Sequence, residues 1–164
     1  MVTIRKATLE DVPAIRDIYN EAIEFGTATF DTELKSLEDR QAWFKNRSPR
    51  YEVLVAVIDD QVVGWGSLNA YSDRLAYAAT VENSIYVHPT FHGKGAGKFL
   101  LEGLLESAKR NQIHCILSRI TQGNDLSVKL HERYGFTLVG VMKEVGVKFD
   151  KLLDVSLLQW INKN

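Results

Sequence analysis

The sequence predicts an α/β protein in which about four helices flank a mixed central sheet of about seven strands. Two observations carry this prediction. Apolar residues recur at helical spacing in some segments and in short strand-like runs in others, and the two kinds alternate through the middle of the chain. A glycine-rich turn at residues 92–97 joins a strand directly to an amphipathic helix. Because no linker, repeat or low-complexity tract interrupts the pattern, we expect a single domain over residues 1–164.

Capping and turn residues place the boundaries of the expected elements. Thr8 and Asp11 form a capping-box pattern before the first helix, Ser36 and Asp39 repeat it before the second, and Gly135 ends the last. The order of the elements predicts a mixed sheet with helices on both faces. The expected strands are residues 2–8, 51–58, 62–71, 80–87, 114–120, 136–142 and 152–161, and the expected helices follow Thr8, Ser36, the glycine turn and Asn124.

Composition excludes several classes of function. Lysine and arginine number 20 and aspartate and glutamate 21, which gives a net charge of −1 and no basic face of the kind that binds nucleic acid. The longest purely apolar run, residues 53–58, is too short to cross a membrane, and the first residues lack a signal-peptide pattern. We therefore expect a cytoplasmic protein without nucleic-acid or membrane partners.

Cysteine and histidine patterns indicate neither a covalent nor a metal site. Cys115 is the single cysteine, so it forms no internal disulfide, and its apolar neighbours favour a buried hydrophobic role over a nucleophile. His88 and His92 are four residues apart, but Pro89 and Gly93 argue against a helix that would bring them together. We expect no metal.

The turn at residues 92–97 is typical of a loop that binds an anion. It fits neither a P-loop, which needs Ser or Thr at Phe99, nor a dinucleotide fingerprint, which needs a glycine at Leu100 or Lys98. What remains is a strand, a tight turn and a helix start, which together aim free backbone N–H groups at one anion. Lys94 and Lys98 add positive charge. The alternative is a turn that only connects the strand to the helix.

The same turn resembles the acetyl-CoA pyrophosphate loop of the GNAT N-acetyltransferases, whose pattern is Gln/Arg-x-x-Gly-x-Gly/Ala. His92, Gly95 and Gly97 occupy the patterned positions, with His in place of Gln or Arg. The resemblance extends over nearly all of residues 1–161 and implies the GNAT fold, acetyl-CoA as co-substrate and a small-molecule amine as acceptor. Three further segments resemble the phosphinothricin N-acetyltransferases and their relatives acting on methionine sulfone or sulfoximine: YAATVENSIYV (77–87), GNDLSVKLHERYGF (123–136) and VGVKFDKLLDV (145–155).

For the co-substrate, the resemblance implies contacts along the strand before the turn and along the turn itself. In this fold pantetheine lies beside that strand like an added strand, so the backbone of Tyr86 and Val87 is expected to bond its amides, with His88 at the strand's end. Asn124, with Ser127, resembles the family's pantetheine-contacting region, and a helix N-cap is an equally good role for Asn124. The N–H groups expected to hold the pyrophosphate are those of His92, Gly93, Lys94, Gly95, Ala96, Gly97 and Lys98.

The chemistry needs a base, because an amine attacks a thioester only as the free base. Glu82 stands in an apolar strand before the turn, and the resemblance assigns the catalytic glutamate to this position; the alternative is a solvent-facing strand residue. His131 stands where most GNAT proteins carry a tyrosine proposed as the acid that meets the thiolate. The ordinary pKa of histidine, near 6.5, suits proton transfer. The alternative is a histidine on the helix surface.

For the acceptor, the resemblance implies three contacts. Arg74 and Tyr77 precede Glu82 in an order similar to the phosphinothricin enzymes, where these positions contact the acidic groups of the substrate. Arginine suits bidentate binding of a carboxylate, although a solvated loop charge is the alternative. Phe30 resembles the aromatic residue that walls the pocket, and its alternative is to anchor a loop to the core.

These residues favour an acetyl-CoA-dependent N-acetyltransferase that acts on a small amino acid or analogue by direct attack. Two alternatives stay open: acetylation of a protein N-terminus or another amine, and an acyl-CoA-binding module without catalysis. Arg74 argues against a polyamine, and intact Glu82 and His131 argue against an idle module. Relatives form dimers, and the apolar strand at residues 152–161 is the segment expected to supply a homodimer interface.

Overall fold

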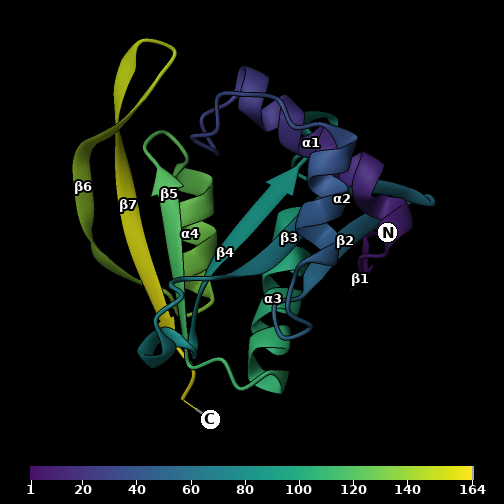
Figure 1. The fold of residues 1–164 in the computed structure, drawn as a ribbon. Coiled ribbons are helices and arrows are strands. Elements are labelled where there is room, and N and C mark those ends of the chain that lie inside the picture. The colour runs from purple at the N-terminus through teal and green to yellow at the C-terminus, as the bar shows by residue number, and fades with distance from the viewer. Residues whose placement is uncertain (164) are drawn as a thin grey trace.

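A seven-stranded mixed sheet organises the chain in the computed structural model, which describes residues 1–163 (Figure 1). The strands lie in the order β1-β2-β3-β4-β5-β7-β6, and every neighbouring pair is antiparallel except β4 and β5. The expected mixed sheet and the expected order of strands and main helices are confirmed. The strands are β1 (Thr3–Lys6), β2 (Val53–Ile58), β3 (Gln61–Ala70), β4 (Thr80–Val87), β5 (Cys115–Thr121), β6 (Thr137–Lys148) and β7 (Lys151–Ile161), and the helices are α1 (Val12–Phe25), α2 (Leu37–Lys45), α3 (Ala96–Arg110) and α4 (Asp125–Arg133).

Helices cover both faces of this sheet (Figure 1). On one face α1 packs against α2, β3 and β4, and its apolar side chains surround Trp65. On the other face α3 packs against β1 to β4 and buries Leu100 and Leu104 completely, each burial contributing about 1.5–3 kcal/mol. α4 lies on this second face too, because its Val128 and Leu130 pack on the same apolar cluster. The two faces are called below the α1 face and the α3 face.

The predicted caps are present, with one difference in the helix they begin. The Thr8 backbone N–H donates to Asp11 Oδ2 at 2.7 Å, but the residues that follow, Leu9–Asp11, form a 3-10 turn before α1. Ser36 Oγ accepts the Asp39 N–H at 3.0 Å and caps α2. The segment expected as a loop before β4 also contains a 3-10 turn, Leu75–Tyr77.

β4 and β5 separate beyond a short paired stretch, as Figure 1 shows. They pair in parallel only between Thr80–Glu82 and Cys115–Leu117. Beyond these residues β4 stays paired with β3 as far as Val87, and β5 stays paired with β7 as far as Thr121. The facing edges of the two strands therefore lack each other as partners. Because buried backbone groups require hydrogen bonds, this gap, called the wedge below, is a natural place for a ligand that bonds to a strand edge.

β6 is longer than the strand that the sequence predicted. It runs six residues beyond Met142, to Lys148, and turns into β7 through Phe149 and Asp150, whose φ angles are +53° and +59°. Such a turn normally carries glycine or asparagine, so Phe149 gave no turn signal. Register shifts near Gly140 and before Gly146 also break the alternation by which a strand is recognised.

Candidate active site

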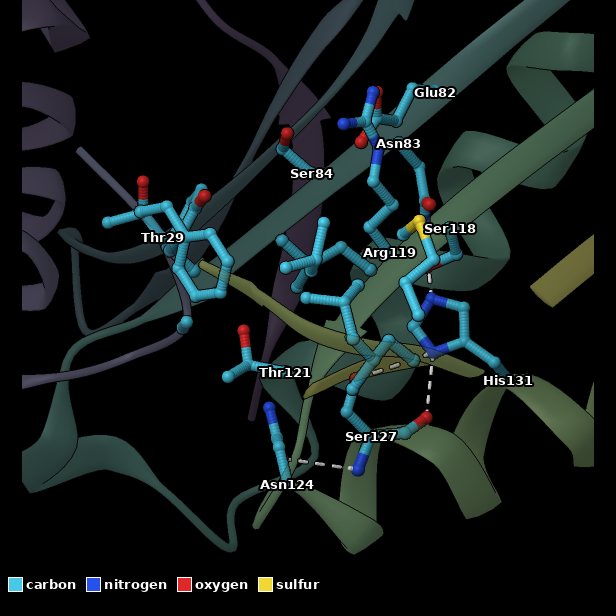
Figure 2. A pocket seen from close by; sticks show the side chains of 18 residues that line it. Thr29, Glu82, Asn83, Ser84, Ser118, Arg119, Thr121, Asn124, Ser127 and His131 are labelled. Atoms are coloured by element: carbon cyan, nitrogen blue, oxygen red, sulfur yellow. Dashed lines mark hydrogen bonds and ion pairs between the residues drawn. The ribbon is translucent and has the colours of Figure 1, made fainter. Parts of the chain in front are cut away.

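The wedge opens into a cavity of about 380 Å³ that is lined by residues from several elements (Figure 2). β4 and β5 form its centre, α4 closes one side, and the loop after α1 and the β6–β7 hairpin close the other. Ordered strands hold the polar groups at its centre, so their positions are fixed by the register of the sheet. The lining residues used below are Thr29, Phe30, Glu82, Asn83, Ser84, Tyr86, Ser118, Arg119, Thr121, Asn124, Ser127 and His131.

Alternation along β4 decides which backbone groups face the wedge. The His88 N–H donates to Val63 O in β3 at 2.9 Å, so the even-numbered positions of β4 direct their backbone groups to β3. The odd-numbered positions direct theirs to the wedge. The expected backbone contact of Val87 with a ligand fits this pattern. The expectation for Tyr86 does not, because its backbone groups face β3.

Glu82 lies at the closed end of the wedge and forms an ion pair across it. Its Oε2 accepts a hydrogen bond from an Nη atom of Arg119 in β5 at 2.8 Å. Glu82 is directly opposite Leu117 in the parallel register, which places Arg119 one step further along the same face. The Glu82 side chain is 26% exposed and that of Arg119 is 53% exposed, so both reach solvent through the cavity. Burial raises the pKa of nearby Tyr86 to about 12, which keeps that phenol protonated. Glu82 is the only aspartate or glutamate among the residues that line the cavity.

The next residue of β4, Asn83, faces the opposite side of the sheet and meets α4. Its Nδ2 lies 3.1 Å from His131 Nε2, and His131 Nδ1 lies 2.7 Å from the Ser127 carbonyl oxygen (Figure 2). A carbonyl only accepts, so Nδ1 carries the proton and Nε2 accepts from Asn83. This chain fixes both the histidine tautomer and the orientation of the asparagine amide.

His131 is buried and neutral rather than exposed on the helix. It is 3% exposed, and its ring packs edge-on against Phe136 with the ring centroids 4.9 Å apart. Burial lowers the pKa of its imidazole, and the hydrogen bond to Ser127 opposes this only in part. The helix-surface alternative is therefore wrong. Since both ring nitrogens are occupied, the geometry favours a histidine that positions Asn83 over one that exchanges protons.

The glycine turn leaves open space in front of its backbone. Gly93 and Gly95 adopt φ angles of +79° and +89°, and a Cβ atom at Gly93 would meet nothing within 4 Å. Gly95 is the N-cap of α3, and the first helical hydrogen bond runs from the Phe99 N–H to its oxygen. The N–H groups at the start of α3 thus lack acceptors within the helix, and they carry its positive dipole end. The arrangement therefore suits an anion.

Side chains around the turn have more specific roles than the sequence indicated. His92 Nε2 lies 2.9 Å from the Val87 carbonyl oxygen, so the imidazole ties the turn to the end of β4. His88 Nδ1 caps the short turn after β4 by accepting the Thr90 N–H at 3.3 Å. Lys94 lies over the ring of Phe91 with its ammonium 5.0 Å from the centroid. Lys98 is exposed and pairs with a helix neighbour across 4.0 Å.

Two residues at the start of α4 that were predicted to contact a ligand both line the cavity. Asn124 caps α4, since its Oδ1 accepts the Ser127 N–H at 3.4 Å, so the capping role is confirmed. The same residue borders the cavity, which leaves the amide nitrogen of its side chain available there. Ser127 also borders the cavity, and its hydroxyl lies 3.4 Å from His131 Nδ1.

Phe30 forms a wall of the cavity together with the hairpin. A Cβ atom at Gly146 of β6 would stand 2.1 Å from the Phe30 ring, so the ring sits directly on this glycine. Lys148, 4% exposed, holds the two segments together by donating from Nζ to the Thr29 carbonyl oxygen at 2.9 Å. Burial lowers the pKa of this lysine. The loop and the hairpin are therefore positioned by each other.

Arg74 and Tyr77 are not among the residues that line the cavity. They belong to the 3-10 turn before β4, where both are exposed, and Tyr77 packs edge-on against Tyr71 with centroids 5.1 Å apart. The sequence missed Arg119, Asn83 and Thr29, whose roles depend on partners far along the chain.

Other predictions concern groups away from the wedge. Cys115 is buried, and its sulfur accepts a hydrogen bond from Gln159 Nε2 at 3.3 Å, which fits the predicted packing role. Across residues 1–163, no group of three or more histidine, cysteine or acidic side chains is arranged to hold a metal ion. Over the same residues no helix combines the length and apolar character that a membrane crossing requires.

Comparison with known proteins gives consistent matches over most of the chain. The model of the acetyltransferase (GNAT) family matches residues 13–136. An L-methionine sulfoximine/L-methionine sulfone acetyltransferase from Pseudomonas aeruginosa is 38% identical over 159 residues, which cover 96% of this chain and 92% of the relative.

Solved structures align over nearly the whole fold. A phosphinothricin acetyltransferase from Sinorhizobium meliloti, in complex with acetyl-CoA, aligns with a TM-score of 0.94 and 31% identity, covering 98% of this chain and 88% of that one. A ribosomal-protein-alanine N-acetyltransferase from Brucella melitensis aligns with a TM-score of 0.94 and 37% identity, covering 98% and 99%.

Proposed function

This chain belongs to the acetyltransferase (GNAT) family, and from that membership we propose that it transfers the acetyl group of acetyl-CoA to the amine of a small amino acid or analogue. The fold implied by the sequence resemblance and the use of acetyl-CoA both agree with the aligned structures, one of which contains this co-substrate. Relatives named for methionine sulfoximine, methionine sulfone and phosphinothricin support an acceptor of that class.

The observation that carries the proposal is the position of Glu82 at the closed end of the wedge. The odd-numbered positions from Asn83 to Val87 direct backbone groups toward the wedge, where they can meet the amides of pantetheine, although the Val87 carbonyl oxygen already contacts His92. The turn after β4 offers N–H groups to the pyrophosphate. A thioester at the end of such a chain would lie among the residues of the cavity. Glu82 stands in that cavity, reaching solvent on the α1 face.

In the proposed reaction Glu82 takes one proton from the ammonium form of the acceptor, directly or through a water molecule, and so frees the amine. The nitrogen lone pair then attacks the thioester carbonyl carbon, and the C–S bond breaks. The nitrogen loses its second proton as it becomes an amide, and the departing thiolate takes up one proton to become the free thiol. No residue of the chain is acetylated. We propose that His131 acts through Asn83, by fixing its amide, because neither ring nitrogen is open for proton exchange.

A second candidate function is acetylation of a protein N-terminus. The likeness to the ribosomal-protein-alanine N-acetyltransferase supports it. A free-thiol assay with acetyl-CoA tests the alternatives by offering the protein methionine sulfone, phosphinothricin, a polyamine and a peptide with a free N-terminus. Turnover of the first two alone supports the proposal. Turnover of the peptide alone supports the second candidate, and no turnover with tight acetyl-CoA binding would indicate a module without catalysis.

The base is tested by Glu82→Gln, which keeps the shape of the side chain and removes its charge. Loss of a positioned base should lower kcat by about 10²–10⁴-fold at neutral pH, while the Kd of acetyl-CoA stays within twofold. Glu106→Gln, on the exposed surface of α3, is the matched control and should behave as wild type. Wild-type turnover in Glu82→Gln would remove this residue from the mechanism.

We also propose that the protein forms a homodimer through the β6–β7 hairpin. The sequence indicated residues 152–161 for the interface, but β7 lies between β5 and β6, and β6 is the edge strand. Along β6, Val139, Val141, Val145 and Val147 are each 46–62% exposed. Edge strands that carry exposed apolar residues invite pairing with another chain. Sedimentation velocity should give twice the mass of the 18.6 kDa chain, and Val141→Lys should shift the protein toward the monomer. A wild-type monomer at micromolar concentration would contradict this.

A further inference from the structure

The cavity contains a second charged group, Arg119, which has no role in the proposed reaction. Among the residues that line it, Arg119 is the only lysine or arginine and Glu82 the only aspartate or glutamate. A guanidinium has five N–H donors. Within residues 1–163, the one recorded hydrogen bond of the Arg119 side chain is the 2.8 Å contact with Glu82. The remaining donors belong to a side chain that is 53% exposed, so they are available to a ligand.

The sheet fixes where these donors lie. Ile116 and Ile120 of β5 pack into the core on the α3 face, so Arg119 projects to the α1 face by alternation. Glu82 projects to the same face, and the ion pair joins the two side chains there. Thr29 and Phe30, from the loop after α1, border this side of the cavity. The positive and negative groups are thus neighbours on the side of the sheet opposite α3.

A free α-amino acid has the matching arrangement of groups, since its amine and its carboxylate are bonded to one carbon atom. With the amine beside Glu82, the carboxylate lies within reach of the neighbouring guanidinium. A polyamine brings no anion to Arg119. A protein N-terminus brings none either, because its first carboxyl group is in a peptide bond.

We propose that Arg119 binds the α-carboxylate of the acceptor and thereby selects free amino acids and their analogues; this inference rests on the proposed function. Arg119 keeps its contact with Glu82 while its other donors hold the carboxylate, which orients the amine toward the base. Arg74, the arginine that the sequence resemblance favoured for this task, is exposed on the turn before β4 and does not line the cavity.

The experiment compares two acceptors that differ at the carboxyl group, L-methionine sulfone and its carboxamide. We expect Arg119→Ala to lower kcat/KM for the acid by roughly 10- to 150-fold and for the carboxamide by less than about threefold. Arg119→Lys should recover part of the loss, because an ammonium keeps the charge but not the planar fork. Arg110→Ala removes another arginine–glutamate ion pair away from the cavity, to the buried side chain of Glu52 at 2.9 Å, and should match wild type on both acceptors.

The ratio of the kcat/KM losses for the two acceptors distinguishes the outcomes. If Arg119→Ala lowers turnover of the acid and the carboxamide equally, the arginine acts only on Glu82 and the inference is wrong. An acid-selective loss in Arg74→Ala and none in Arg119→Ala would assign the carboxylate to Arg74 instead. A wild-type protein that acetylates neither compound, nor phosphinothricin in the acceptor panel, refutes the proposed function, and the inference falls with it. Circular dichroism of each variant establishes that the compared proteins are folded.

Discussion

Acidification should destabilise this protein through His131, and the effect can be isolated with one substitution. The imidazole is buried and neutral, and burial lowers its pKa in the folded state. In the unfolded chain a histidine titrates near pH 6.5. Below that pH the unfolded state therefore binds a proton that the folded state resists, and the free energy of unfolding falls as pH falls.

The size of the effect follows from that difference in bound protons. One proton taken up only by the unfolded state changes the free energy of unfolding by about 1.4 kcal/mol per pH unit. Between pH 7.5 and 5.5, a histidine that titrates at 6.5 when unfolded and stays neutral when folded accounts for a loss of at most about 1.4 kcal/mol. Protonation of His131 would also set its Nε2–H against the Asn83 Nδ2–H, and both groups are donors. The clash is relieved only if the Asn83 amide rotates and presents Oδ1, which is buried and has no hydrogen-bond partner.

The assay is urea unfolding at pH 7.5, 6.5 and 5.5, with His131→Gln compared against wild type. Glutamine does not titrate, so the variant should lose stability less steeply with acidification, whatever its absolute stability. His114→Gln, at an exposed position, is the matched control and should keep the wild-type slope. Equal pH slopes for wild type and His131→Gln would show that the buried histidine does not resist protonation.

Two other predictions concern the glycine turn and the cysteine. Gly95→Val should raise the Kd of acetyl-CoA at least tenfold in isothermal titration, because its side chain obstructs the approach of the pyrophosphate. Gly97→Ala should bind acetyl-CoA normally, because its new methyl group would meet nothing closer than 3.9 Å. Normal binding by a folded Gly95→Val protein would place the anion elsewhere. Cys115→Ala should keep at least half of wild-type kcat, because the buried thiol packs in β5 away from the cavity, and an acetylated Cys115 found by mass spectrometry during turnover would contradict direct transfer.

The parts of the fold and site that follow local rules could be predicted from the sequence. The caps at Thr8 and Ser36, the strand before the glycine turn and the helix after it all depend on residues within a few positions of each other. Glu82 could be identified because it stands in an apolar strand next to a recognisable turn, and the family resemblance reinforced that reading.

The parts that depend on contacts between distant segments could not. Arg119 looks like an isolated charge in an apolar strand until the parallel register brings it beside Glu82, 37 residues earlier. His131 looks like a surface histidine until α4 packs it against Asn83, 48 residues away. The extension of β6 was missed because Phe149 adopts a positive φ that its side chain does not indicate.

Glu82 and Asn83 are neighbours in sequence, yet they serve opposite sides of one strand. Under the proposed function, the α1 face receives the acceptor, while Asn83, His131 and the start of α3 attend to the acyl donor on the other. A protein built this way can change its acceptor by substitutions in the loop after α1, in the hairpin and at Arg119 without altering how it holds coenzyme A. β4 should therefore not tolerate the insertion or deletion of one residue. Such a change would move each side chain to the opposite face of the sheet, so that Glu82 would face the acyl donor and Asn83 the acceptor.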